Sequence, residues 1–219
     1  MEHRKNRPGR VGALLQTGPR RHVLKKNWGE IVRPKTVKSL PDVTTHAQMA
    51  ALLKATREQR YQTFFFITYG MGLSLVEALS LQVKDIDAAQ MRIHTRPREN
   101  KKDRYVTLPL LALLALRHNR QTHHHPTLLL PAGSTTRERF RATKHMSKSG
   151  VQRTTKKIAA DAGICTNVAP HTLRHAFATH LLERGLSLGQ IQQLLGHESI
   201  ETTLMYTKLT KLPNKTHLC

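Results

Sequence analysis

The C-terminal part of the chain carries side chains whose types and spacing suit phosphodiester chemistry without a metal. His171 and Arg174 stand three positions apart, and His197 ends a Leu-Leu-Gly-His run that is followed by a lone Tyr206. Arginine clamps phosphate oxygens, histidine donates hydrogen bonds or moves protons, and a phenol can attack phosphorus. These four side chains therefore indicate a phosphodiester as the substrate.

The charge of the chain indicates which phosphodiester. The 219 residues carry a formal net charge of +22, with a sequence pI near 10.9. A cationic excess of this size favours nucleic acid as the partner, because neutralising phosphates releases condensed counterions. A membrane surface is the alternative, but no stretch approaches the ~20 apolar residues of a membrane span. No long apolar run follows the basic start of the chain, so we find no secretory signal and predict a cytoplasmic protein.

Apolar periodicity predicts the elements that must position these groups. With 38% apolar residues the chain can bury a core, and most of its periodic segments have the spacing of helices. Two alternating segments, 91–95 and 104–108, are predicted as strands joined by a basic link. The predicted fold class is mainly α with a small antiparallel β-sheet (α+β). Helices are predicted over residues 45–56, 61–73, 75–81, 109–118, 148–162, 172–183, 188–195 and 200–209.

Helix geometry indicates how the C-terminal groups are presented. A spacing of three residues puts His171 and Arg174 on one face of a helix whose start Pro170 favours. Gly196 is a natural residue for the end of a helix and leaves His197 in a turn. The segment around Arg174 is otherwise apolar, so its guanidinium needs an anion. Either a phosphate or a structural salt bridge would serve, and we prefer the phosphate because few carboxylates lie near in sequence.

Other residues have plainer interpretations. Tyr206 by itself would be a surface or core aromatic, and its offset from the Leu-Leu-Gly-His run is what favours a nucleophile. The three consecutive histidines 123–125 lie in a basic segment, 121–147, that we predict to be irregular. Three adjacent histidines cannot all face one ion on a regular element, so we interpret them as a solvated loop rather than a metal site. His180 follows the core face of its helix and is predicted to be structural.

One long run of the sequence resembles a known family. Residues 170–209, PHTLRHAFATHLLERGLSLGQIQQLLGHESIETTLMYTKL, are similar to the C-terminal half of the catalytic domain of tyrosine recombinases, the phage-integrase family. The family's His-x-x-Arg box matches His171 and Arg174, its Leu-Gly-His box ends at His197, and its nucleophile matches Tyr206. The joint match of boxes and spacings is far more specific than any one of them. The resemblance extends over about residues 41 to 209.

The resemblance implies the catalytic-domain fold of tyrosine recombinases and a mechanism. Tyr206 would attack a phosphate of double-stranded DNA and form a 3′-phosphotyrosyl link, which the 5′-hydroxyl of a partner strand then attacks. Bond energy is kept in this intermediate, so no metal, ATP or other cofactor is required. Arg174 would clamp the phosphate, His171 would handle protons or bind the phosphate, and His197 would donate a hydrogen bond to it. Members of the family act as oligomers on DNA.

Two positions depart from the family's pattern. The family carries a catalytic arginine in a Thr-Gly-Leu-Arg-x-x-Glu segment, and the matching run 71–77 has Ser74 at the arginine position. The family also places a lysine on the β-hairpin, where this chain has Glu99. Lys101 or Arg98 would substitute for that lysine if the loop shifts by a residue or two. Because each lost donor costs on the order of 10²–10³ in rate, we predict impaired catalysis.

We expect three parts along the chain. Residues 1–40 are a basic arm or the remnant of a core-binding domain, 41–212 form the catalytic domain, and 213–219 form a short basic tail. So short an arm cannot form the family's helical core-binding domain, and the chain is expected to be N-terminally truncated.

Two functions on the recombinase fold compete. A DNA recombinase or integrase competes with a non-catalytic DNA-binding remnant of a mobile-element integrase. A basic RNA-binding or ribosome-associated protein is the third function, and it predicts no role for Tyr206.

Overall fold

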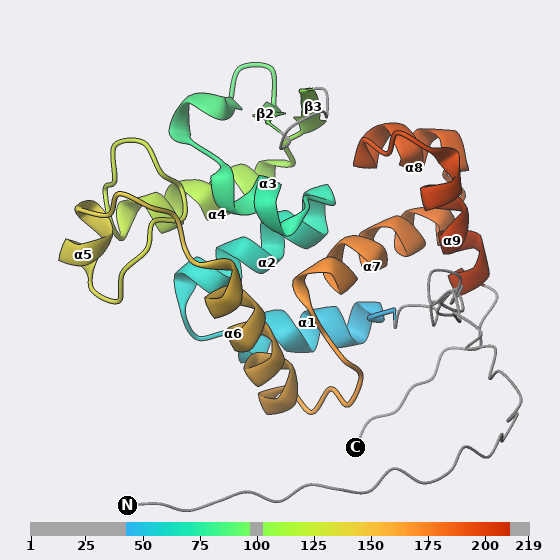
Figure 1. Ribbon diagram of the computed structural model, residues 1–219, viewed down its shortest axis with the longest axis horizontal. Helices are drawn as coiled ribbons and strands as arrows, with labels where there is room; N and C mark the ends of the chain where they lie inside the picture. Colours follow the sequence, from blue (N-terminus) through green and yellow to red (C-terminus); the bar gives the residue numbers. More distant parts are fainter. Residues whose placement is uncertain (1–42, 97–102, 211–219) are drawn as a thin grey trace, which may run out of the picture. The chain divides into compact units, whose positions relative to one another are not determined.

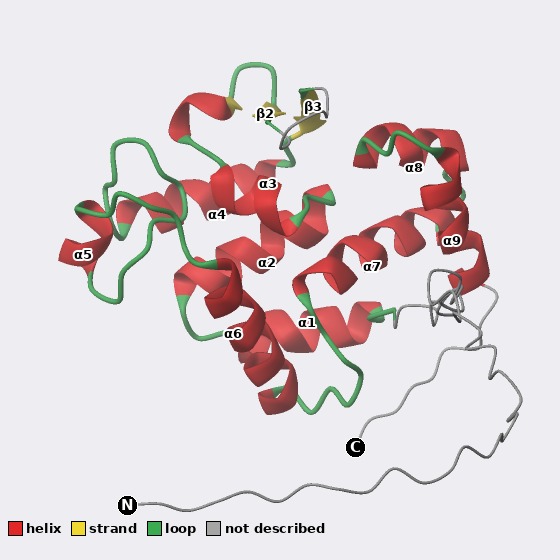
Figure 2. Cartoon of the chain, viewed as in Figure 1, coloured by secondary structure: helices red, strands yellow, loops and turns green. Residues whose placement is uncertain are grey.

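Helices make up most of the chain that the structure describes (Figure 1, Figure 2). The computed structural model describes residues 43–96 and 103–210, with side chains up to residue 207. These residues confirm the predicted class, mainly α with a small antiparallel sheet. Within the described ranges, no helix is long and apolar enough to cross a membrane. The helices are α1 (His46–Ala55), α2 (Gln59–Met71), α3 (Leu75–Ser80), the 3-10 turn η2 (Val83–Asp85), α4 (Leu110–Gln121), α5 (Thr136–Phe140), α6 (Lys148–Asp161), α7 (Pro170–Glu183), α8 (Leu188–Leu195) and α9 (Ile200–Thr210).

A three-stranded antiparallel sheet comes between α3 and α4 in chain order. β1 (Ile86–Asp87) pairs with β2 (Arg92–Thr95), which pairs with β3 (Arg104–Thr107). β2 and β3 lie within the two predicted strands, whereas β1 is too short for an alternating pattern to reveal it. Ile93 pairs with Val106 in the register, and both side chains are buried. This pair fixes which face of the hairpin meets the core.

The core is built around α2, against which both α4 and α7 pack. Phe64 and Phe65 of α2 are fully buried and meet edge to face, and Phe66 is half-buried. Full burial of one such side chain stabilises the fold by roughly 1.5–3 kcal/mol. α7 in turn lies between α2 and α9 (Figure 1). The helix that carries Arg174 is therefore held by the core on one side and packs against the Tyr206 helix on another.

The turn between α2 and α3 is fixed against α7 by a glycine. Gly72 has a φ of +61°, in the left-handed region that favours glycine. A Cβ there would lie 2.4 Å from Cδ1 of Phe177 on α7, so glycine lets the two elements approach. Ser74 then caps α3: its Oγ accepts the backbone N–H of Glu77 at 3.2 Å, and the Glu77 carboxylate accepts the Ser74 N–H at 2.7 Å. This reciprocal pair fixes the Glu77 carboxylate in place.

Two of the three consecutive histidines are buried, so the prediction of a solvated loop is wrong for them. His123 is 1% exposed and His125 is 5% exposed. Nδ1 of His125 accepts the backbone N–H groups of Thr127 (3.1 Å) and Leu128 (2.8 Å), and its Nε2 lies 2.8 Å from the carbonyl of Ala142. The ring satisfies backbone groups of an irregular segment, a role that leaves no periodicity in the sequence. The same segment contains α5, which buries no side chain and has no apolar face to predict it.

Candidate active site

Three consecutive helices, α7, α8 and α9, present the side chains that the sequence singles out. Pro170 opens α7, as predicted. α8 ends at Gly196 in the left-handed conformation, with a φ of +65°. The Oγ of Ser199 accepts a backbone N–H of the first turn of α9 at 3.1 Å. His197 therefore lies in the turn between two helices, as the sequence predicts, and Tyr206 lies within α9.

The Tyr206 side chain points into the protein. It is 1% exposed, and its Oη lies 3.2 Å from Nδ1 of His175. The ring of His197 is nearly parallel to the phenol, with the two centroids 6.2 Å apart. Burial raises the pKa of Tyr206, and the charge of Arg174 partly offsets this. The phenol is therefore protonated at neutral pH, with an imidazole nitrogen beside its oxygen.

Arg174 is held by an ion pair and two backbone carbonyls. Its Nη1 donates to Oε2 of Glu77 (3.0 Å) and to the carbonyl of Gly72 (2.9 Å), and its Nη2 donates to the carbonyl of Leu195 (2.5 Å). The structural salt bridge, the less favoured sequence interpretation, is therefore present, because Glu77 is remote in sequence but adjacent in the fold. Burial lowers the pKa of Arg174 although Glu77 opposes the shift, yet a guanidinium stays charged in proteins.

One carboxylate serves two guanidinium groups. Oε1 of Glu77 accepts from Nη2 (3.0 Å) and Nε (3.2 Å) of Arg104 on β3, while its Oε2 accepts from Arg174. Burial by itself would raise the pKa of Glu77, but Arg104, the N–H of Ser74 and Arg174 together lower it. Two cations and one anion leave a net positive charge in a mostly buried setting, where attraction to a further anion is stronger than in water. This group of Glu77, Arg104 and Arg174, the arginine cluster, remains suited to a phosphate.

Arg104 also explains the glycine of the Leu-Gly-His run. Its Nη1 donates to the carbonyl of Leu194, so the side chain passes beside the end of α8. A Cβ at position 196 would lie 2.6 Å from Cδ and 2.8 Å from Nε of Arg104. Gly196 is thus required both by its positive φ and by the passage of Arg104. The sequence does not reveal Arg104 as a site residue, because its partners are remote along the chain.

His175 is a second residue, after Arg104, that lies at the candidate site and that the sequence analysis misses. It follows Arg174 on α7, and its ring meets those of His171 (centroids 5.7 Å apart) and Tyr206 (5.6 Å). Burial lowers the pKa of His175 to about 4, and the charges of His171 and Arg174 act in the same direction. The available signal is spacing, since a residue four positions after His171 shares its side of a helix as well as Arg174 does.

The structure brings Arg174, His197 and Tyr206 together, with His171 at the exposed edge of the group. Nδ1 of His197 lies 2.9 Å from Oγ1 of Thr203, which orients the ring over the phenol. The charge of Arg174 acts on the Tyr206 hydroxyl. His171 is exposed and reaches the others through the ring of His175. All four residues that the sequence singles out therefore belong to one group of side chains.

A comparison of the whole sequence with known families identifies the family of this chain. The model of the phage integrase family matches residues 42–212, which is most of the chain. The chain belongs to the phage integrase family. This membership confirms the resemblance to tyrosine recombinases that the motifs of α7 to α9 indicate.

Relatives and solved structures of this family share the fold. Tyrosine recombinase XerA of Thermococcus onnurineus (strain NA1) is 34% identical over 179 residues, which cover 81% of this chain and 61% of the relative. A crystal structure of XerA recombinase is 26% identical, with a TM-score of 0.68 over 80% of this chain and 62% of that one. A structure of XerH site-specific recombinase bound to a palindromic difH substrate is 21% identical, with a TM-score of 0.65 over 79% of this chain and 51% of that one. This chain thus spans about three fifths of the XerA proteins it matches.

Of the two positions that we expect to depart from the pattern of the phage integrase family, the structure describes one. Ser74 stands at the N-cap of α3, and its backbone N–H lies 2.7 Å from the carboxylate oxygen of Glu77 that also binds Arg174. Position 74 therefore borders the arginine cluster, and a neutral side chain occupies it. Glu99 lies outside the described residues, together with the two neighbouring cations that would replace it.

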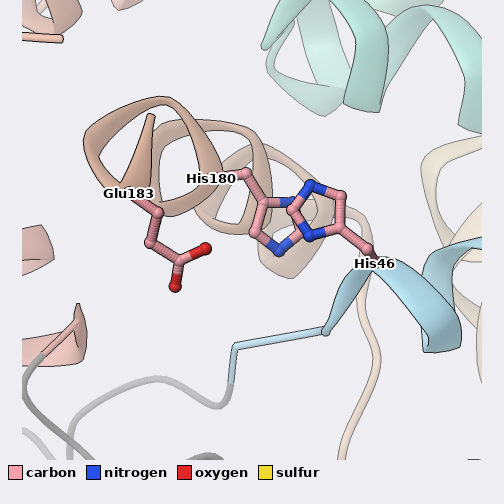
Figure 3. A group of neighbouring side chains, drawn as sticks. All are labelled: His46, His180 and Glu183. Atoms are coloured by element: carbon pink, nitrogen blue, oxygen red, sulfur yellow. The ribbon is translucent and has the colours of Figure 1, made fainter. Parts of the chain in front are cut away.

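Away from this group, His46, His180 and Glu183 bring three potential metal ligands within 4.8 Å of one another. Figure 3 shows the two imidazoles face to face with Glu183 to one side; the ring centroids are 3.6 Å apart and the planes differ by 18°. The in-plane lone pairs of stacked rings run side by side instead of converging on one ion. Nδ1 of His180 also lies 2.8 Å from the hydroxyl of Tyr69. Packing accounts for this group, and His180 is buried, as predicted for a structural residue.

Proposed function

We propose that the chain cleaves and rejoins double-stranded DNA through a 3′-phosphotyrosine intermediate, as a site-specific recombinase or integrase. The observation that carries this proposal is the grouping of Tyr206 with Arg174 and His197, beside a carboxylate shared by two guanidinium groups. A phenol as nucleophile, an excess of positive charge and hydrogen-bond donors are what attack on a phosphodiester needs. Membership of the family supports the same reaction.

Each residue has one role in the proposed reaction. Tyr206 attacks the phosphorus, and the 5′-oxygen of the next nucleotide leaves. Arg174 binds phosphate oxygens and stabilises the charge that grows on them in the transition state. His171 handles protons or binds the phosphate from the exposed edge, and His197 donates a hydrogen bond to the phosphate. A 5′-hydroxyl then attacks the phosphotyrosine, so the strands rejoin without ATP, a metal or another cofactor.

Glu77 preorganises the two arginines without neutralising both of them. Its two oxygens each bind a different guanidinium, so the carboxylate orients both groups and cancels one of their two charges. Charges that are already oriented need no reorganisation as the transition state forms, which is a main source of electrostatic catalysis. A DNA phosphate at Arg174 would supply the second anion that this pair of cations lacks.

The proposal extends to partners and domains. We assign the reaction to residues 41–212, with residues 1–40 as a basic arm or remnant of a core-binding domain and 213–219 as a basic tail. The net charge of +22 supports double-stranded DNA as the partner through counterion release. Strand exchange joins two duplexes, so an oligomer on DNA, acting in the cytoplasm, is the expected working form.

A non-catalytic DNA-binding remnant is the second candidate. One observation favours it: position 74 borders the arginine cluster but carries a neutral side chain whose Oγ caps α3. The loss of one preorganised donor costs on the order of 10²–10³ in rate, and Glu99 would repel a phosphate at the second altered position. This candidate predicts salt-sensitive duplex binding without any covalent product.

Covalent trapping separates the two candidates. The full chain is incubated with a library of nicked duplexes of randomised sequence, in which cleavage releases a short oligonucleotide and leaves the protein on the DNA end. A protein–DNA band that resists SDS, and that Tyr206→Phe abolishes, is the result expected of a recombinase. Equal duplex binding by the wild-type chain and Tyr206→Phe, with no such band from either, would select the remnant.

A further inference from the structure

Besides His197, a second histidine lies against Tyr206, namely His175 on α7. Nδ1 of His175 lies 3.2 Å from the Tyr206 Oη, and the two ring centroids are 5.6 Å apart. Nδ1 of His197 is within hydrogen-bond distance of Thr203, at 2.9 Å from its Oγ1. The proposed function gives His175 no role, although a phenol that attacks phosphorus must lose the proton on its oxygen.

We propose that His175 accepts the Tyr206 proton during attack on phosphorus and returns it when the tyrosine is displaced. This inference rests on the proposed function. As the bond from Oη to phosphorus forms, the O–H bond breaks and the proton moves to Nδ1 of His175. The bond from phosphorus to the 5′-oxygen breaks, and that oxygen takes a proton from a separate donor, a role open to His171. In the rejoining step the attacking 5′-hydroxyl returns its proton to that donor, and the departing Oη recovers its own proton from Nδ1.

The surroundings of His175 keep its ring ready to accept a proton. Burial, with the charges of His171 and Arg174, lowers the pKa of His175 to about 4, so the ring is neutral at pH 7. Within the described part of the chain, the groups that face the His175 ring are His171 and Arg174 on α7, Tyr206 on α9 and, beyond the phenol, His197. A DNA phosphate bound at Arg174 adds negative charge and therefore raises the proton affinity of the ring at the step that uses it.

Among the residues that the structure describes, few other acceptors are open to the phenol. Tyr206 is 1% exposed, so bulk water has little access to its hydroxyl. Arg174 stays charged and cannot take a proton. His171 is exposed and meets the ring of His175 edge-on, with centroids 5.7 Å apart. His175 thus connects the buried phenol to an imidazole at the surface.

Replacing His175 by asparagine separates proton acceptance from positioning. The side-chain oxygen of His175→Asn lies near the place of Nδ1 and accepts a hydrogen bond, but it does not bind a proton at neutral pH. We expect single-turnover formation of the covalent link at pH 7 to fall roughly 10²–10⁴-fold. The variant's rate should then rise about tenfold per pH unit as the phenol ionises, a dependence that the wild type lacks. Parallel pH profiles of the two proteins would overturn the proposal.

A duplex with sulfur in place of the bridging 5′-oxygen isolates the attack step, because a thiolate leaves without a proton donor. His171→Asn, on the same helix, is the matched control and should recover its rate on this duplex. His175→Asn should stay slow; its recovery would assign His175 to the leaving group and overturn the proposal. Each assay is run in the wild-type chain and in the Ser74→Arg, Glu99→Lys background, so that slow cleavage does not hide the effect.

The tautomer of His175 tests the inference without turnover. In the full chain with ¹⁵N-labelled histidine, His175→Asn identifies the signal by its loss. An unprotonated Nδ1 whose resonance shifts in Tyr206→Phe is the expected result. A protonated Nδ1 would donate to the phenol and overturn the proposal, even in an active enzyme. Absence of any covalent product from both backgrounds would instead refute the proposed function itself, so the two failures are distinguishable.

Discussion

The two halves of the proposed site are expected to keep different amounts of the family's chemistry. The C-terminal half, α7 to α9, holds Arg174, His197 and Tyr206 in one group. The N-terminal half is the α2–α3 turn with the β-hairpin, and we expect its Ser74 to stand where the family has an arginine. The halves meet at Glu77, whose carboxylate still orients Arg174. The N-terminal half thus keeps its positioning role although the side chain at position 74 is neutral.

This difference shows that the local fold at position 74 can be kept without a positive charge there. Ser74 caps α3 through a reciprocal pair of hydrogen bonds with Glu77, so its presence leaves the turn intact. Arg104 supplies a second cation to Glu77 from the hairpin. We therefore expect the two halves to differ in their effect on the rate of cleavage, with the scaffold equally sound in both.

The largest expected effect comes from restoring the N-terminal half. Ser74→Arg and Glu99→Lys replace both altered positions with the family's cations, and each added donor should raise the rate of covalent trapping on the order of 10²–10³-fold. The measurement is single-turnover trapping on the nicked duplexes. Ser74→Ala is the matched control, because it removes the helix cap without adding charge and should cost about 1 kcal/mol of stability. No change in the double variant would contradict our assignment of these two positions.

A loss in the C-terminal half gives the next largest effect. Arg174→Lys keeps a positive charge but loses the planar fork that binds two phosphate oxygens, so trapping should fall on the order of 10²–10³-fold. Arg104→Lys makes the same exchange in the hairpin half and should fall less, because Arg104 contacts Glu77 and the end of α8. Equal losses in a trapping assay would break the comparison by making both arginines phosphate ligands.

Local signals account for the parts of the fold and site that the sequence predicts. Apolar periodicity marks most of the helices and both longer strands, because each pattern is written within one element. Pro170 and Gly196 mark a helix start and a helix end for backbone reasons that act within a few residues. The spacing from His197 to Tyr206 spans one turn and part of one helix, so it too is local.

Contacts between remote segments account for what the sequence does not reveal. Glu77 binds Arg104 and Arg174 across three elements, and no periodicity within any of them records the pairing. The sequence does not single out His175, because His175 and Arg174 both share a helical side with His171. The packing of α9 decides which of the two meets Tyr206. His125 is buried by hydrogen bonds to loop backbone, where the pattern of apolar residues carries no information.

The shared carboxylate is predicted to matter more for stability than any surface ion pair. Glu77→Gln keeps an acceptor for the N–H of Ser74 but leaves two mostly buried guanidinium groups uncompensated, so the free energy of unfolding should fall by about 3–5 kcal/mol. Urea unfolding measures this loss. Glu58→Gln removes an exposed partner of Arg60 and should cost less than about 1 kcal/mol. Similar costs for the two variants would mean that Glu77 does not join the halves of the site.

The smallest expected effect tests the passage of Arg104 beside the end of α8. Gly196 and Gly163 have nearly equal φ values, +65° and +68°, but an added Cβ meets Arg104 at the first and nothing within 4 Å at the second. Gly163→Ala should therefore cost about 1 kcal/mol for its backbone conformation, and Gly196→Ala should cost about 1 kcal/mol more for the collision.

A double-mutant cycle with Arg104→Ala isolates that excess. With the arginine side chain removed, Gly196→Ala should cost no more than Gly163→Ala in urea unfolding, because the remaining penalty is the positive φ that both positions share. An excess that survives Arg104→Ala would show that the end of α8 tolerates no side chain for reasons of its own. The hairpin would then not determine the glycine before His197, and the contact between the two halves would rest on Glu77.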